Sequence, residues 1–197
     1  IIRSDKRFTY EEAQEIIDQG ARGDTTGLFY TELAELMRFS KIYTQERFKD
    51  GALSMDTDEV RFILDENGKP VRVMIKKRID TMRMIEEWML LANKYVAKKL
   101  SEKTAAGLAV YRIHDKPSPD RVEDLVTFLK SIGYTNIPVK NGIIPPHVLQ
   151  KIIDEAGTDD ARDTIQSSIV RSMAKAIYST ENIGHFGLAF EYYTHFT

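Results

Sequence analysis

Apolar residues recur along this 197-residue chain at helical spacing in some segments and in alternation in others, and these two periods predict its elements. The two longest helical patterns cover 28–49 and 80–100. Shorter helices, most of them opened by a capping residue or by proline, are expected at 9–18, 118–133, 145–155 and 159–178. Between the first two helices, the polar, glycine-rich stretch 19–27 predicts a flexible loop.

Strand patterns fill the spaces between these helices. The strongest is the Asn67-Gly68 turn between two runs of apolar residues, which predicts a hairpin with strands at 60–64 and 71–75. Further strands are expected at 52–56, 109–113 and 184–196. The chain is therefore expected to be of the α+β class, a single domain of long packed helices against an antiparallel or mixed sheet.

The helix expected at 80–100 is apolar on two opposite faces, so both faces should pack against other elements. On a projection of about 100° per residue, its charged residues, including Glu87, gather in one narrow stripe. Glu86 and Asn93 fall outside that stripe, and a carboxylate in such a place needs a partner. Glu86 is then either half of a structural ion pair with an internal arginine or a site carboxylate that lines a cavity with Asn93 beside it.

Composition narrows the possible functions. Charged residues make up 29% of the chain and the formal net charge is −2, so any RNA binding must come from a local basic surface or from parts of the protein outside this chain. Cysteine is absent, which excludes disulfides and thiolate chemistry and suits a reducing compartment. No apolar run has the length of a membrane span. These features predict a cytoplasmic protein without a membrane partner.

Six segments of the chain form recognisable motifs. They are RFTYEEAQ at 7–14, GAL at 51–53, IEEWMLLAN at 85–93, YRIHDKP at 111–117, RSMAKAIYS at 171–179, and GHFGLA at 184–189 followed by YTHFT at 193–197. In this order along the chain they resemble the catalytic RNB domain of ribonuclease II/R-type 3′→5′ exoribonucleases. The resemblance implies a processive, hydrolytic enzyme that uses Mg²⁺, degrades single-stranded RNA and releases 5′-mononucleotides.

The same resemblance implies that this chain is an internal part of that domain. The family's metal-binding aspartate cluster is expected before Arg3, and an arginine that acts at the scissile phosphate is expected after Thr197. We therefore expect no tightly bound Mg²⁺ and no activity from the chain alone, and we expect as partners the rest of the catalytic domain and flanking RNA-binding domains. The acidic run from Asp56 to Glu59 is expected to be a solvated turn rather than the metal site.

Three residues receive roles from the resemblance. Tyr10 stands where the family abuts a terminal nucleotide, although it could equally be a packed residue of the first helical turn. Met55 stands where relatives often carry a phenylalanine that clamps the 3′-terminal base, so the clamp would be weaker here. Glu86 stands where the family's catalytic-site carboxylate meets the last ribose, and it could accept a hydrogen bond from a 2′-hydroxyl that DNA lacks.

The other candidate RNA contacts rest on residue type and position. Arg112 and His114 alternate on an expected strand and share one face, although a buried histidine is more often a core residue. Arg171 lies four residues before Lys175 on an expected helix, as a phosphate contact or as part of a solvated face. The set is completed by Asn93 and by the turn residues His185, Phe186 and Gly187. No residue is predicted to bind a metal.

Two alternatives to an exoribonuclease remain. A non-catalytic RNA-binding relative could keep the same fold and lack the chemistry, and the aspartate cluster would decide between the two. An unrelated α+β interaction domain is the third possibility, and the ordered motifs argue against it.

Overall fold

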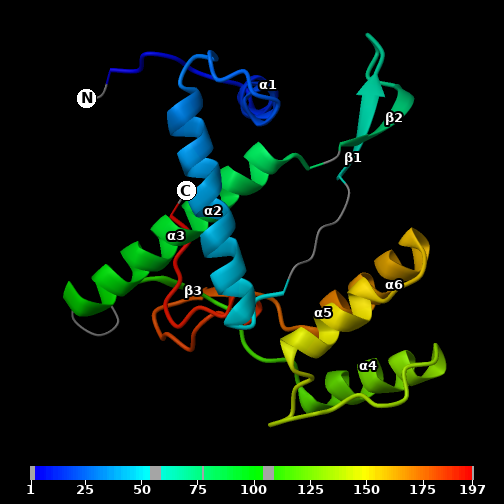
Figure 1. Cartoon of the computed structure of the whole chain (residues 1–197). Coiled ribbons are helices and arrows are strands. Elements are labelled where there is room, and N and C mark those ends of the chain that lie inside the picture. The colour runs from blue at the N-terminus through cyan, green and yellow to red at the C-terminus, as the bar shows by residue number, and fades with distance from the viewer. Residues whose placement is uncertain (1–2, 54–58, 77, 104–108, 197) are drawn as a thin grey trace. The chain divides into compact units, whose positions relative to one another are not determined.

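The computed structural model describes residues 3–53, 59–76, 78–103 and 109–196 (Figure 1). In this part of the chain six α-helices accompany two small antiparallel sheets, which confirms the α+β class. The chain divides into two compact units, unit 1 with residues 1–45 and 56–90 and unit 2 with residues 46–55 and 91–197. Each unit is described by itself. None of the helices in the described ranges has both the length and the apolar character of a membrane span.

Unit 1 is built on three helices. Helix α1 (Tyr10–Ala21) begins with a capping box, in which the Thr9 side chain accepts a hydrogen bond from the backbone N–H of Glu12 at 3.1 Å and the Glu12 carboxylate accepts one from Thr9 at 2.7 Å. Helices α2 (Tyr30–Lys49) and α3 (Asp80–Lys103) contribute their first parts to this unit.

Side chains join these three helices. The hydroxyl of Thr81, at the start of α3, donates to the carbonyl of Tyr10 in α1 at 2.9 Å. The Trp88 indole N–H of α3 donates to the carbonyl of Leu36 in α2 at 3.2 Å. The rings of Trp88 and Tyr43 meet edge to face, with their centroids 5.8 Å apart. Hydrogen bonds and an aromatic contact therefore hold α1 and α2 against α3, in addition to the packing of apolar side chains.

The predicted hairpin is confirmed. Strands β1 (Glu59–Leu64) and β2 (Pro70–Lys76) pair in antiparallel fashion. The Asp65 carboxylate accepts hydrogen bonds from the backbone N–H groups of Asn67 and Lys69, both at 2.9 Å. Gly68 has a φ of 78°, a conformation that favours glycine. The turn is therefore determined by residues that lie within it.

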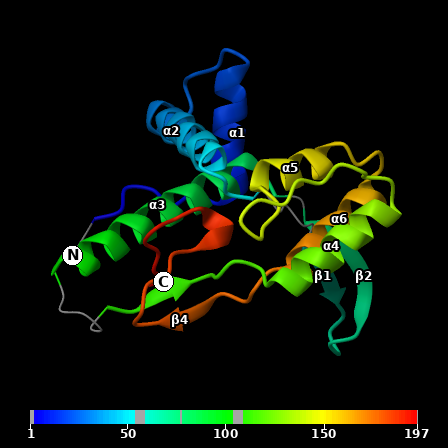
Figure 2. The ribbon, with the colours of Figure 1, turned by 90° about the horizontal axis from the view of Figure 1, so that it is seen from below.

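Unit 2 has a helical layer and a small sheet. Helices α4 (Pro119–Ser131), α5 (Pro146–Asp154) and α6 (Asp159–Ser172) pack together, with α4 and α6 side by side (Figure 2). Their shared core includes Val122, Leu125, Leu129, Leu149, Ile152, Ile153, Ile165 and Ile169. Strand β3 (Tyr111–Ile113) pairs with β4 (Ile177–Ser179), also in antiparallel fashion.

The end of the last helix was predicted wrongly. Helix α6 stops at Ser172 instead of continuing to Tyr178, because Met173 turns into an extended conformation and residues 177–179 pair with β3. The spacing of apolar residues continues past the true end, but pairing with a distant strand overrides it.

Two predicted strands are also corrected. Residues 184–196 hold a short 3₁₀ helix, η1 (Phe186–Leu188), and isolated bridges rather than a regular strand, because positive φ angles at Gly184 and Ala189 bend the chain. Ala52 and Leu53 are not in a strand, and the rest of the segment predicted at 52–56 lies outside the described residues, as does Asp56–Asp58. Helix α1 extends into the predicted loop as far as Ala21; the flexibility of the remaining loop residues stays a prediction.

Candidate functional site

The ring of His114, which follows β3, ties together three segments of unit 2. Its Nδ1 accepts a hydrogen bond from the backbone N–H of Gly187 at 3.0 Å, and its Nε2 lies 2.9 Å from the carbonyl oxygen of Ala174. Because a backbone N–H can only donate and a carbonyl can only accept, the ring is the neutral tautomer with the proton on Nε2. His114 is buried with both nitrogens satisfied, which is the arrangement of a core histidine.

The backbone of His114 adds two bonds to the same turn, residues 184–187, called the GHFG turn below. The N–H of His114 donates to the carbonyl of Gly184 at 3.0 Å, and the N–H of Phe186 donates to the carbonyl of His114 at 2.8 Å. On the other side of the turn, the carbonyl of Gly187 accepts from the N–H of Leu53 at 3.3 Å. The turn is thereby held on both sides.

His185 lies between two other rings. Its ring centroid is 4.9 Å from that of His114 and 5.1 Å from that of Tyr193, and its Nδ1 accepts from the N–H of Leu188 at 3.3 Å. Burial is the main cause that lowers the pKa of His185 from 6.5 to about 4. The neighbouring His114 and Arg112 lower it further, because they disfavour a positive charge on this ring. At neutral pH the candidate RNA contact His185 is therefore an uncharged ring.

This shift predicts acid-sensitive stability. The unfolded chain takes up a proton at His185 near pH 6.5 and the folded chain only near pH 4, so the stabilisation is complete above pH 6.5 and is lost as the pH falls toward 4. After a discount for partial exposure, the loss is about 1–2 kcal/mol. Urea unfolding of the full-length protein at pH 7.5 and pH 5 measures it.

The control for this experiment is a histidine that lies on the surface. His185→Asn, which keeps an acceptor for Leu188 but does not titrate, should flatten the pH dependence of the unfolding free energy, whereas the same change at exposed His147 should leave it as in the wild type. Equal pH dependence in wild type and His185→Asn would contradict the prediction.

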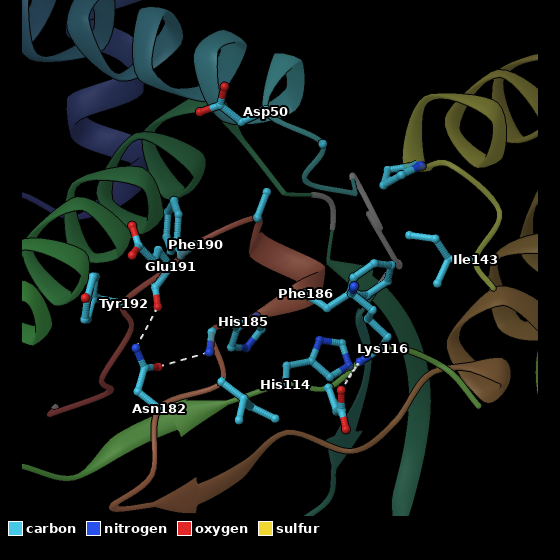
Figure 3. A pocket seen from close by; sticks show the side chains of 16 residues that line it. Asp50, His114, Lys116, Ile143, Asn182, His185, Phe186, Phe190, Glu191 and Tyr192 are labelled. Atoms are coloured by element: carbon cyan, nitrogen blue, oxygen red, sulfur yellow. Dashed lines mark hydrogen bonds between the residues drawn. The ribbon is translucent and has the colours of Figure 1, made fainter. Parts of the chain in front are cut away.

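A cavity of about 650 Å³ lies beside the GHFG turn (Figure 3). The Asn182 side chain braces its wall, because its Oδ1 accepts from the N–H of Gly184 at 3.0 Å and its Nδ2 donates to the carbonyl of Glu191 at 2.9 Å. His185 and Phe186 line the cavity. The lining carries three carboxylates, Asp50, Asp115 and Glu191, and one amine, Lys116. Carboxylates repel phosphates, so the charges at this cavity do not favour an RNA backbone.

Cationic residues lie elsewhere in unit 2. The guanidinium of Arg112 lies 4.7 Å from the centre of the Tyr178 ring. Arg171 is exposed in the last turn of α6, and its carbonyl accepts from Arg121 at 3.3 Å. The expected helical pair of Arg171 with Lys175 is wrong, because the helix ends before Lys175.

The environments predicted for the two neighbouring glutamates of α3 are wrong: Glu87 is buried and Glu86 is partly exposed, the reverse of the prediction. Glu87, placed on the solvent stripe by the projection, is 4% exposed and accepts from the Thr44 hydroxyl at 3.0 Å. Glu86 forms an ion pair with Arg78, and its side chain is 46% exposed. The helical projection describes α3 alone, so it contains no information that α2 covers the side of the helix on which Glu87 lies. The pairing with an arginine agrees with one of the two interpretations, but the pair is not internal.

Three further candidates differ in what surrounds them. Asn93 is buried, as predicted, and its side-chain N–H group lies 3.5 Å from the Tyr193 hydroxyl; in the described part of the chain its Oδ1 has no hydrogen-bond partner. Tyr10 opens α1 and is 43% exposed, so its ring is available for contact. Met55 lies outside the described residues. The RNA-binding roles of all these residues stay predictions.

Sequence reasoning missed Tyr178 and Tyr193. The rings of Tyr193 and His185 meet edge to face, and the Tyr193 hydroxyl lies 3.3 Å from Nδ1 of His195. Tyr178 stands across from Arg112 in the β3–β4 pair. The Ile177-Tyr178 dipeptide carries β-forming residues that could have indicated this strand.

The described residues lack the ligand cluster that a metal site needs. No three histidine, aspartate or glutamate side chains of residues 3–53, 59–76, 78–103 and 109–196 come together in a way that could hold an ion. The residues that the structure describes therefore do not fit a magnesium centre.

Comparison with known proteins gives consistent matches. The family model for the RNB domain matches residues 1–197. Ribonuclease R of Thermotoga maritima is 36% identical over 200 residues, an alignment that covers 100% of this chain and 27% of that protein. The chain thus spans about a quarter of the length of the curated relatives it matches.

Solved structures have the same fold. RNase R of Mycoplasma genitalium, in complex with ribose-methylated single-stranded RNA, matches with a TM-score of 0.82 and 22% identity, over 97% of this chain and 29% of that one. Yeast Ssd1, a pseudonuclease, matches with a TM-score of 0.66 and 20% identity, over 96% of this chain and 23% of that one. The fold is therefore common to a nuclease and to a pseudonuclease.

Proposed function

We propose, from the premise that this chain belongs to the RNB domain family, that it is part of a hydrolytic, processive 3′→5′ exoribonuclease that degrades single-stranded RNA to 5′-mononucleotides. The observation that carries the proposal is the match to Ribonuclease R over 100% of the chain. The ordered motifs support it, because they include the residues at the GHFG turn and on α3. The absence of cysteine favours a cytoplasmic site of action.

Within that enzyme, we propose that this chain forms part of the wall of the RNA channel. Single-stranded RNA is held by stacking on aromatic rings and by cations on phosphates. Tyr10, Arg112 and Arg171 supply such groups at or near the surface. We further propose that Mg²⁺, which the described residues do not fit, is held by other parts of the longer polypeptide, and that these parts and flanking RNA-binding domains complete the site.

A pseudonuclease is the second candidate, and the resemblance of the fold to yeast Ssd1 is what favours it. A protein of this kind would bind RNA without cleaving it. The two candidates differ in one measurable property, the release of nucleotides.

The test uses the full-length protein, labelled poly(A) and Mg²⁺. We expect mononucleotides to appear from the first time points without a ladder of intermediates, because a processive enzyme does not release its substrate. The 197-residue chain alone is expected to release nothing above a mock preparation. Binding without release by the full-length protein would establish the pseudonuclease, and neither binding nor release would refute both candidates.

A further inference from the structure

The β3–β4 sheet presents a cation and an aromatic ring on one face. Arg112 and Tyr178 are direct cross-strand partners, so their side chains point to the same side of the sheet. The guanidinium lies over the ring at 4.7 Å from its centre. On the other side, Tyr111 and Ile113 are buried and anchor the strand in unit 2.

Both members of the Arg112–Tyr178 pair contact backbone carbonyls near the end of the chain. The N–H of Arg112 donates to the carbonyl of Tyr193 at 2.9 Å, and the Tyr178 hydroxyl lies 3.5 Å from the carbonyl of His195. A ring and a guanidinium on paired strands lose little conformational freedom when a ligand binds, so the pair is prepared for contact.

Charge and exposure distinguish this pair from two other cation–aromatic contacts of the chain, those of Arg38 and Lys94. Arg38 lies over Phe39 but forms an ion pair with Glu35 at 2.7 Å. Lys94 lies over Phe190, whose ring is buried.

Arg112, by contrast, has no carboxylate within ion-pair distance in the part of the chain that the structure describes. Tyr178 is 54% exposed. The Arg112–Tyr178 pair therefore combines an aromatic surface that is open to solvent with a cation that no acidic side chain of the described residues neutralises.

We propose that Tyr178 and Arg112 form one nucleotide contact for single-stranded RNA, in which a base stacks on the tyrosine ring and the guanidinium binds an adjacent phosphate. The contact rests on the proposed function and adds Tyr178 to it. Stacking needs an accessible ring, and a planar guanidinium binds phosphate oxygens through paired N–H groups. The contact reads no base identity, because every base has a face that can stack.

The test measures binding of two labelled probes to the full-length protein in EDTA, which prevents hydrolysis. One probe is an oligoadenylate and the other is a strand of the same length with abasic riboses. Tyr178→Ala should weaken binding of the oligoadenylate about tenfold or more, with a much smaller effect on the abasic strand. Tyr178→Phe should stay within about twofold of wild type, because it keeps the ring.

Arg112→Gln tests the phosphate half of the contact. It should weaken binding of both probes and reduce the slope of log Kd against log salt concentration by roughly 0.7, the value for one phosphate on a single strand. An unchanged slope would show that Arg112 touches no phosphate and would overturn this half of the proposal.

The matched control is Tyr95→Ala, the same change at a tyrosine of unit 2 that is 62% exposed. If Tyr178→Ala lowers the melting temperature, Tyr178→Leu decides instead, since leucine fills space without an aromatic face. If the wild-type protein degrades oligoadenylate but the Tyr178 variants bind it as Tyr95→Ala does, the proposed contact is overturned and the proposed function is left intact. Wild-type protein that neither binds nor degrades RNA would refute both.

Discussion

His114→Ala is expected to destabilise the protein by about 3–5 kcal/mol, the largest effect on stability that we predict for a single side chain. The substitution leaves two half-buried backbone groups, the N–H of Gly187 and the carbonyl of Ala174, without the partner that His114 supplies. Each unsatisfied group costs about 1–3 kcal/mol, and the space left by the ring adds to the loss. Urea unfolding of the full-length protein measures the change in free energy.

Two other variants show whether the hydrogen bonds are responsible. In His114→Asn the side-chain oxygen can take the place of Nδ1 and accept from Gly187, so the loss should be clearly smaller than for alanine. His147→Ala removes an exposed histidine of α5 and should change the stability by less than about 0.5 kcal/mol. A His114→Ala protein as stable as His147→Ala would mean that the ring does not hold the GHFG turn.

His114 also shows which features of the structure can be predicted from the sequence and which cannot. Local chemistry determines the capping box at Thr9 and the turn at Asn67-Gly68, so both could be predicted from a few neighbouring residues. For His114 the sequence indicates a core residue as one of two roles, and it places the residue next to the strand that the structure ends at Ile113. Its partners Gly187 and Ala174 lie 73 and 60 residues away along the chain. Such contacts depend on tertiary structure, which no local pattern contains.

The glutamates of α3 show the same limit at the candidate site. Helical periodicity gives the direction of each side chain, but not which neighbouring element covers it. Glu87 is buried because its carboxylate meets the Thr44 hydroxyl of α2, whereas Glu86 reaches Arg78, which immediately precedes the helix region. Adjacent residues of one type therefore differ in burial, and only one of them is open to a ligand.

This difference predicts opposite outcomes for two neighbouring substitutions. Glu86→Ala should reduce the preference of the full-length enzyme for RNA over DNA by about one to two decades, because one hydrogen bond to a charged acceptor is worth roughly 1.5–3 kcal/mol. Arg78 bonds to Oε2 of Glu86, and among the described residues Oε1 accepts no hydrogen bond, so it can accept one from a terminal 2′-hydroxyl. The stability should fall by less than about 1 kcal/mol, since both side chains of the ion pair are partly exposed to solvent.

Glu87→Ala is the matched control, because it is the same change one residue further along the helix. It removes a buried acceptor and strands the Thr44 hydroxyl, so it should cost about 1–3 kcal/mol of stability and leave the preference for RNA unchanged. The measurements are urea unfolding and the ratio of kcat/KM on RNA to that on RNA with a 2′-deoxy terminus. If Glu86→Ala keeps the wild-type ratio, its carboxylate serves only Arg78, and the ribose must be recognised by other residues.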